Sequence, residues 1–496
     1  MKDYIEKYIS MIPMYVMTIG SVAIIIILAL ILSVADLLRY TPLEIISSTI
    51  AFTVSGVVFN KILSKLYSVN PNQTSAIITS LLLVAVFGPS TNIATLLQYI
   101  IVSAFAQASK YIITYRSRHI FNPAALAIFI AGTAQLQYAN WWIGTPSLLP
   151  ITIILSYCIL KKTNHLYIGA WFVAISTILI SYTDIQNGAT IQQAMMTSLA
   201  SWPIIFIAGF MLSEPLTLPG THKHKIITAS IVAIITSLPI NLVFFNTTPA
   251  FALLIGNIIA FGFAYHQRHS IYLKLKDSTK IANNTYEYTF TSSKKLTFRA
   301  GQFIEIQLPH THPDIRGMRR YFSIASAPQD SEIKLGIKFY QPSSSFKQAL
   351  RHLKPNTKLR VVNTGGDFVL PNNSQTKLLF IAGGIGVTPF ISQIRDTNNT
   401  NQDIAMAYFN KAKNDIAYFN ELTKSKHDIK FIVEEPSEAT SLIHGTFDTD
   451  QIIKLFPDYK EREIYISGPP SMVSSIEKSM SKITKKPIHT DYFTGY

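Results

Sequence analysis

The pattern of apolar residues changes once along the chain, near residue 268. Before that point the apolar residues form long runs, and the clearest is Met14–Leu38 with the string AIIIILALIL. A helix needs roughly 20 apolar residues to cross a bilayer. Residues 1–268 are therefore expected to form an all-α membrane bundle of about ten helices. The other nine spans are expected near Pro42–Asn60, Ser75–Phe87, Thr91–Ala108, Pro123–Gln135, Pro146–Leu160, Tyr167–Thr183, Ser198–Leu212, Ile226–Phe245 and Pro249–Tyr265.

Beyond residue 268 the apolar runs are short and suggest strands. Over residues 269–375 they predict an antiparallel six-stranded β-barrel with one helix at Ser345–Leu353. The expected strands are Ile271–Leu275, Thr285–Thr291, Gln302–Leu308, Arg320–Ser326, Ile333–Phe339 and Lys358–Asn363. Over residues 376–496 strands alternate with helical segments, which predicts an α/β domain with a parallel sheet. Its expected strands are Leu378–Ala382, Ile404–Phe409, Ile429–Glu434 and Glu463–Ser467.

Charge gives the N-terminal half an orientation. The net charge is +15, but no basic tract is interleaved with aromatic residues, so nucleic acid is not an expected partner. With ten spans, the basic residues gather on alternate loops, as in cytoplasmic loops of membrane proteins. These residues are Lys61, Lys65, Lys110, Arg116, Arg118, Lys161, Lys162, Lys223 and Lys225. We therefore expect a multi-pass protein of the cytoplasmic membrane with its C-terminal half in the cytoplasm. Trp141 and Trp142 lie in an opposite loop and suit an interfacial belt.

Cysteine and histidine usage excludes several redox centres. Cys158 is the only cysteine, and an iron–sulfur cluster needs about four ligands. The histidines of the N-terminal half lie in loops or at expected helix ends, so no histidine pair is available to hold a haem inside the bilayer. No metal site is expected.

Four strings in the C-terminal half carry candidate chemistry. Arg320–Ser326 (RYFSIAS) combines a guanidinium that can bind a phosphate, aromatic rings and hydroxyls. The alternative interpretation, without a bound ligand, is a strand with one arginine at the surface. In Leu379–Pro389 (LFIAGGIGVTP) an apolar strand leads into glycines and then a helix, which suits a pyrophosphate. The other two strings are Ile466–Met472 (ISGPPSM) and the terminal Ile488–Tyr496 (IHTDYFTGY).

In this order and spacing, the four strings resemble the ferredoxin–NADP reductase superfamily. The resemblance implies an NAD(P)H-dependent flavin oxidoreductase with an FAD-binding barrel and an NAD(P)-binding domain. Ser323 and Phe493 are then expected at the reacting face of the flavin. The residues implied to hold FAD are Arg320, Phe322, Ser323, Ser344 and Ser345. Those implied to hold NAD(P)H are Gly383, Gly384, Gly386, Thr388, Pro389, Gly468, Pro469 and Met472. Two positions depart from the family pattern, since Phe322 replaces a tyrosine and Ser467 a cysteine.

The nucleotide preference stays open. Lys411 and Lys413, which follow the second strand of the α/β domain, could meet a 2′-phosphate or could simply be solvated.

The N-terminal half resembles a second family. The strings FNPAAL (121–126) and SEPLTLP (213–219), with Gly188-Ala189-Thr190 between them, are similar to the B subunit of sodium-pumping NADH:quinone oxidoreductase and the D subunit of Rnf-type complexes. In that family a threonine carries FMN through a phosphoester bond, which a flavin transferase makes at the outer face. The resemblance implies covalent FMN on Thr190, although Asn187 stands where the attachment motif has Ser or Thr.

Together these patterns give one main hypothesis and two alternatives. In the main one, electrons pass from NAD(P)H to cytoplasmic FAD, through the membrane domain to the outer FMN, and on to an external acceptor or quinone. The first alternative is a component of a redox-driven ion pump with partner subunits. The second is a membrane-anchored reductase that serves a cytoplasmic electron-acceptor protein.

Overall fold

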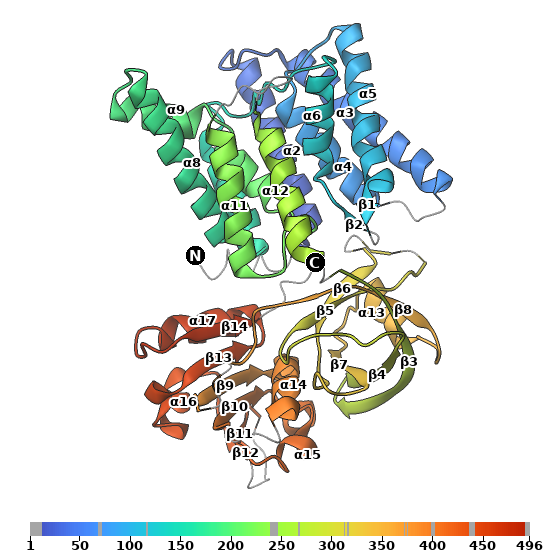
Figure 1. Cartoon of the computed structure of the whole chain (residues 1–496), viewed down its shortest axis with the longest axis vertical. Coiled ribbons are helices and arrows are strands. Elements are labelled where there is room, and N and C mark those ends of the chain that lie inside the picture. The colour runs from blue at the N-terminus through green and yellow to red at the C-terminus, as the bar shows by residue number, and fades with distance from the viewer. Residues whose placement is uncertain are drawn as a thin grey trace. The chain divides into compact units, whose positions relative to one another are not determined.

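A computed structural model describes residues 12–67, 72–115, 118–238, 247–265, 268–311, 313–314, 317–371, 373, 375–397, 402–435 and 442–491. The chain divides into two compact units, a helical unit within Tyr8–His266 and a second unit within Gln267–Gly495. Figure 1 shows the helical unit in blue to green and the second unit in yellow to red.

Helices build the first unit. They are α2 (Met14–Val34), α3 (Pro42–Leu66), α4 (Gln73–Val86), α5 (Ile93–Ile112), α6 (Pro123–Thr133), α7 (Leu149–Lys162), α8 (Leu166–Gln186), α9 (Ile191–Ala200), α10 (Ile204–Phe206), the π-helical turn η1 (Ile207–Leu212), α11 (His222–Ser237) and α12 (Pro249–Ala264). A two-stranded hairpin, β1 (Thr114–Tyr115) and β2 (Arg118–His119), precedes α6. Several helices begin at capping residues followed by proline, as at Thr41-Pro42 and Asn122-Pro123.

The expected number of ten spans is too high. Within the described ranges, three helices are long and apolar enough to cross a membrane, namely α2, α3 and α8. A fourth span results if α9 and Ile204–Leu212, bent by 47°, count as one. The other apolar segments do form helices, but α4 has only 14 residues and α6 only 11. At about 1.5 Å per residue, neither reaches across a hydrocarbon layer of about 30 Å. Part of the expected span Ile226–Phe245 lies outside the described residues.

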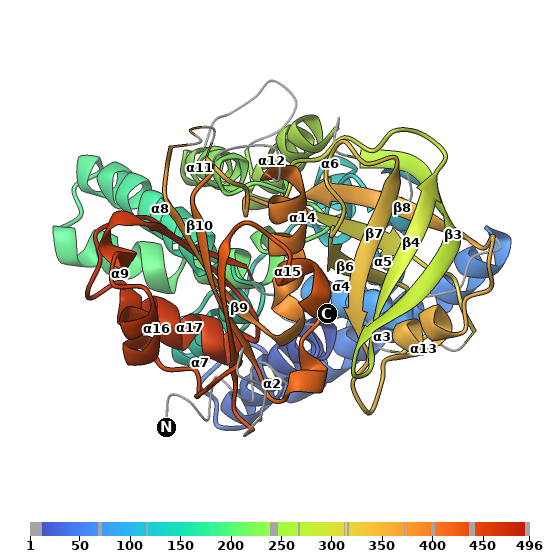
Figure 2. The ribbon, with the colours of Figure 1, turned by 90° about the horizontal axis from the view of Figure 1, so that it is seen from below.

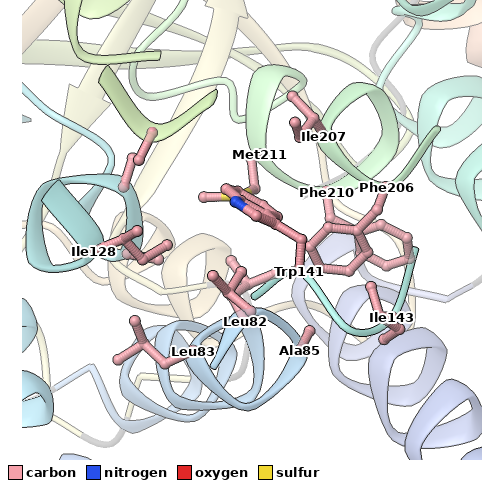
Figure 3. Close-up of a cluster of buried hydrophobic side chains, with 14 of the residues drawn as sticks. Leu82, Leu83, Ala85, Ile128, Trp141, Ile143, Phe206, Ile207, Phe210 and Met211 are labelled. Atoms are coloured by element: carbon pink, nitrogen blue, oxygen red, sulfur yellow. The ribbon is translucent and has the colours of Figure 1, made fainter. Parts of the chain in front are cut away.

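The core of the helical unit includes two residues that were expected at a membrane interface. Trp141 and Trp142 are 9% and 4% exposed, and the indole of Trp142 donates to Val84 O at 2.6 Å. Figure 3 shows Trp141 among side chains of α4, α6 and η1. Phe206 and Phe210 stack beside it, with their ring centroids 4.9 Å apart. The interfacial interpretation of the two tryptophans was therefore wrong, because they fill the interior of this unit.

The second unit opens with the expected antiparallel barrel. Its strands are β3 (Arg268–Ala282), β4 (Thr285–Ser292), β5 (Phe303–Gln307), β6 (Arg319–Ser323), β7 (Glu332–Lys338) and β8 (Lys358–Gly365). They pair antiparallel in the order β6-β5-β8-β3-β4-β7, and α13 (Ser345–Arg351) follows β7. Alternate residues such as Leu273, Phe290 and Ile304 are fully buried in the interior.

The parallel sheet completes the unit. Its strands are β9 (Leu378–Gly383), β10 (Ile404–Asn410), β11 (Asp428–Val433), β12 (Leu442–His444), β13 (Glu463–Ser467) and β14 (Ile488–Asp491). Its helices and turns are η2 (Gly384–Val387), α14 (Thr388–Thr397), η3 (Lys413–Asp415), α15 (Phe419–Leu422), α16 (Thr449–Leu455), η4 (Tyr459–Glu461) and α17 (Pro470–Met480). Leu378 and Phe380 pack on one face of the sheet and Leu379 and Ile381 on the other, so both faces are covered. The short strands β12 and β14 were not expected from the sequence.

Candidate functional site

Strand β6 and the start of α13 bring the expected flavin residues together. Arg320 and Phe322 share one face of β6, because strand residues alternate between faces. Both lie against the buried ring of Phe346: the Arg320 guanidinium carbon is 5.3 Å, and the Phe322 ring centroid 6.0 Å, from the Phe346 centroid. Ser344 caps α13 by accepting a hydrogen bond from Lys347 N at 3.2 Å.

A carboxylate ties these residues into one network. Asp314 accepts hydrogen bonds from Arg320 Nη2 at 3.3 Å and from Ser345 N at 3.0 Å. Its own N–H donates to Ser345 Oγ at 2.8 Å, and the His310 imidazole lies 3.0 Å from the same oxygen. Two donors expected to meet a flavin phosphate thus already bind an anionic group. Because a phosphate accepts the same kind of hydrogen bond as a carboxylate, these residues fit the phosphate end of FAD.

The strand order of the parallel sheet defines where a nucleotide fits. The sheet has the strand order β12-β11-β10-β9-β13-β14. After β9 the chain adds β10, β11 and β12 on one side of β9, and it then crosses back to place β13 on the other side of β9. Ligands of such sheets bind beyond the carboxyl ends of the strands where the order reverses. At this edge β9 ends at Gly383 and β13 ends at Ser467, followed by Gly468.

The two glycine-containing loops touch each other there. A Cβ atom on Gly386 would lie 2.6 Å from both Gly468 Cα and Ser467 O, and one on Gly383 would lie 2.3 Å from Met472 Sδ. Gly384 has φ +54°, a backbone conformation that suits glycine. The loops therefore expose backbone at close range, as a pyrophosphate requires. They fit NAD(P)H.

The remaining expected residues occupy more varied positions. Thr388 is buried, and its hydroxyl donates to Ile385 O at 2.7 Å and closes the η2 turn. Pro389 is buried in the first turn of α14, and Pro469 precedes α17. Met472 packs beneath Gly383 and Gly468 and supports the loop from the core side. Ser323 ends β6 opposite Phe303. Phe493 lies outside the described residues.

One carboxyl group at this edge was not singled out from the sequence. Asp491 ends β14 and pairs in register with Ser467. Burial raises the pKa of Asp491 to about 7. Asp314 was also missed, although an acidic residue six positions before Arg320 could have been considered as a partner of that arginine.

In the helical unit, the two family-like strings meet at a partly buried carboxylate. Glu214 of SEPLTLP lies 3.0 Å from the imidazole of His119 and accepts a hydrogen bond from Asn122 Nδ2, of FNPAAL, at 2.9 Å. Asn122 N in turn donates to Asn257 Oδ1 at 2.7 Å. Thr190 lies elsewhere, exposed at the N-cap of α9, where it forms a capping box with Gln193. No cluster of three or more metal-ligating His, Cys, Asp or Glu residues occurs among the described residues.

Comparison with known families identifies the second unit. Residues 272–369 match the oxidoreductase FAD-binding domain, and residues 380–478 match the oxidoreductase NAD-binding domain. The chain thus carries an oxidoreductase FAD-binding domain followed by an oxidoreductase NAD-binding domain, and these support NAD(P)H-dependent flavin oxidoreductase activity.

Several curated proteins are similar to this part of the chain. A stachydrine N-demethylase reductase subunit of Rhizobium meliloti is 24% identical over 215 residues, which are 41% of this chain and 60% of that protein. A flavohemoprotein of Bacillus subtilis is 25% identical over 242 residues, 45% of this chain and 55% of that protein. A plasma membrane-associated coenzyme Q6 reductase of Saccharomyces cerevisiae is 27% identical over 227 residues, 42% of this chain and 72% of that protein. The chain spans about half to three fifths of the first two proteins.

Solved structures give a weak likeness. The flavohemoprotein-like FAD/NAD-binding domain of a Vibrio cholerae nitric oxide dioxygenase aligns with 46% of this chain and 99% of that chain, at 16% identity and a TM-score of 0.41.

Proposed function

We propose that this NAD(P)H-dependent flavin oxidoreductase is a membrane protein that passes electrons from cytoplasmic NAD(P)H into its helical unit and on to an external acceptor or quinone. The observation that carries the proposal is the joining, in one chain, of FAD-binding and NAD-binding domains to a helical unit with three helices able to cross a membrane. A relative named as a plasma membrane-associated coenzyme Q6 reductase supports this combination.

The residues of the second unit take defined parts in the reaction. The loops at Gly383–Gly386 and Gly468 bind the pyrophosphate of NAD(P)H. Arg320 and Ser345 bind the FAD phosphates, and Phe322 packs beside the flavin. FAD, when bound, accepts a hydride from the nicotinamide carbon and can release the two electrons singly. Ser323, at the end of β6, and Phe493 are proposed at the reacting face.

Covalent FMN on Thr190 is the proposed outer end of the path. The Thr190 hydroxyl is exposed at the start of a ten-residue helix, after Gly188 with φ +95°. A flavin transferase could reach it, and the free N–H groups of the first helical turn suit the phosphate it would carry. Because the hydrocarbon layer is about 30 Å thick, transfer across it requires a further carrier between the two flavins.

The test is a search for flavin that survives denaturation. The full chain is expressed with a flavin transferase, denatured and examined for in-gel fluorescence beside Thr190→Ala. Thr41→Ala is the matched control, because Thr41 forms an equivalent capping box with Glu44. A band lost only in Thr190→Ala supports delivery through the membrane. A dark wild-type band, with the transferase active on another substrate, removes the outer FMN from the proposal.

Two observations favour the alternatives. The Glu214–His119 pair joins the two strings similar to the sodium-pumping family through ionisable groups; this favours a redox-driven ion pump. The similarity to a demethylase reductase subunit favours an anchored reductase that serves a separate protein. Sodium-dependent NAD(P)H oxidation would support the pump, and a wild-type chain without covalent flavin would support the anchored reductase.

A further inference from the structure

Strand β7 of the barrel contacts the nucleotide loop directly at Gly336. The atoms closest to a Cβ built on this glycine would be Tyr418 Oη at 2.6 Å, Thr388 Oγ1 at 3.1 Å and Ile385 Cδ1 at 3.5 Å. Ile385 and Thr388 belong to the turn and the helix start that follow β9, where the pyrophosphate of NAD(P)H is expected. The barrel and the nucleotide loop therefore meet at a residue that has no side chain.

Tyr418 cannot easily move out of this contact. Its backbone has φ +59°, which is unusual for a non-glycine residue, and only 6% of it is exposed. The Arg395 guanidinium carbon lies 5.4 Å from the centroid of its ring. A strained backbone and a covered ring leave the hydroxyl in a fixed position.

The segment before Tyr418 is attached to the barrel as well. Asn283 N, in the turn between β3 and β4, donates to Asn414 O at 2.8 Å. Lys338 Nζ, at the end of β7, lies 3.2 Å from Asp415 Oδ1 in a largely buried ion pair. Residues 414–418 thus reach the barrel at three points, and the Tyr418 hydroxyl is the one beside the nucleotide loop.

Helix α14, which follows the nucleotide loop, also contacts the FAD-binding domain. Ser392 Oγ donates to Ser326 O at 2.7 Å, and Gln393 Nε2 donates to Phe368 O at 2.8 Å. Both views show α14 between the parallel sheet and the barrel (Figures 1 and 2). The loop that begins this helix is therefore held between two sets of barrel contacts.

We propose that Tyr418 is a positioning residue for hydride transfer, because its hydroxyl, packed against Gly336 where the nucleotide loop also approaches β7, sets the spacing between the nucleotide loop and the flavin side of the barrel. The inference rests on the hydride-transfer part of the proposed function and not on delivery into the membrane. In that step the nicotinamide C–H bond breaks and one hydride passes to FAD, so NAD(P)H is oxidised to NAD(P)+ as FAD is reduced. Such transfers are sensitive to distance: a displacement of about 1 Å can cost about 100-fold in rate.

The test combines a change that crowds the contact with one that relieves it. Gly336→Ala places a methyl group against Tyr418 Oη, and Tyr418→Phe removes that oxygen. Anaerobic stopped-flow reduction of the full-length holoprotein, with NADH or NADPH in excess, gives the limiting rate constant per bound FAD. The charge-transfer absorbance between nicotinamide and flavin reports their spacing.

Gly336→Ala is expected to keep its FAD and to lower the limiting rate constant about 10- to 100-fold. Gly336→Ala/Tyr418→Phe is expected to regain most of this loss. Tyr418→Phe alone, which introduces no clash, is expected to lower the rate constant about threefold to tenfold and to weaken the charge-transfer absorbance. Tyr340→Phe is the matched control at an exposed tyrosine beside β7, with unchanged kinetics expected.

Three results would overturn the inference while leaving the hydride-transfer function in place. The first is a Gly336→Ala chain with wild-type rate constant and charge-transfer absorbance. The second is a double variant no faster than Gly336→Ala. The third applies if Gly336→Ala fails to retain FAD: a Tyr418→Phe chain with the rate constant and charge-transfer absorbance of the wild type would then contradict the proposal. A wild-type chain that neither nucleotide reduces removes the hydride-transfer function itself, and the inference with it.

Discussion

Arg395 of α14 and Glu287 of β4 form an ion pair between the NAD-binding and FAD-binding domains, with Arg395 Nη2 donating to Glu287 Oε2 at 3.2 Å. Their side chains are 15% and 12% exposed. The same guanidinium donates twice to Glu421, at 2.7 Å each, and once to Ala325 O at 3.0 Å. One arginine therefore satisfies groups from both domains at a site that is mostly closed to water.

Removal of this guanidinium should destabilise the second unit. Arg395→Met keeps much of the apolar side chain but leaves the Glu287 carboxylate with only Lys334 Nζ, 3.6 Å away, as its cation. The cost should therefore be lower than the roughly 3–5 kcal/mol of a buried charge left without any partner. We expect the full-length chain to release FAD, detected by its fluorescence, at a clearly lower temperature. Lys276→Met is the matched control, because the Lys276–Glu332 pair is more exposed and should contribute little to stability. Equal shifts in the two variants would contradict a structural role for the buried pair.

Arg320 should control FAD affinity through its phosphate contact. Arg320→Gln removes the charge, and the loss of a hydrogen bond to a charged group, worth about 1.5–3 kcal/mol, corresponds to roughly 10- to 100-fold weaker binding. Asp314→Asn should not weaken FAD, because Asp314 competes with the phosphate for Arg320 and Ser345 N. Equilibrium titration of the FAD-depleted chain, followed by quenching of FAD fluorescence, measures both constants. Similar weakening in both variants would indicate that the network matters only for the fold of this loop.

Most strands of the second unit could be predicted because their apolar residues recur at a regular spacing in the sequence. Ile304 and Ile306, two positions apart in β5, are both buried in the barrel, and the four expected strands of the parallel sheet all form. Strands β12 and β14 were missed because segments of three and four residues are too short to show a regular alternation of apolar and polar residues. The glycine loops could be placed as well, since each directly follows an apolar strand.

The sequence was a poorer guide where long-range contacts decide the outcome. Hydropathy alone counted α4 and α6 as spans, although capping and chain breaks leave them too short. It likewise assigned Trp141 to an interface, although tertiary packing buries its side chain. The left-handed backbone of Tyr418 and its contact with Gly336, 82 positions earlier in the numbering, leave no local sequence signal.

Gly386 should tolerate no side chain at all. A methyl group there would lie within 2.7 Å of three backbone atoms of Ser467 and Gly468, and backbone cannot swing aside as a side chain can. Gly386→Ala should therefore open the nucleotide site and raise the KM for NAD(P)H at least about tenfold, while FAD stays bound to the barrel. Gly384→Ala is the comparison, since its new methyl meets no atom within 4 Å and only its φ of +54° is unfavourable. Steady-state ferricyanide reduction measures both, and an equal effect of the two variants would argue against close packing of the loops.

Asp491 should make the second unit less stable as pH rises through neutrality. Burial raises the pKa of Asp491 to about 7, whereas an aspartate in the unfolded chain titrates near pH 4 (about 3.9). The stabilising contribution of the neutral acid is thus complete below about pH 4 and is lost as pH rises through 7, because the folded chain must then hold a charge at a half-buried position. Asp491→Asn is permanently neutral, so its FAD-release temperature should fall less than that of the wild type between pH 6 and pH 8. The nearby His489–Glu463 pair is the same in both chains, so it does not distinguish them in the comparison. Parallel pH profiles would show that Asp491 is already ionised, and therefore solvated, at pH 6.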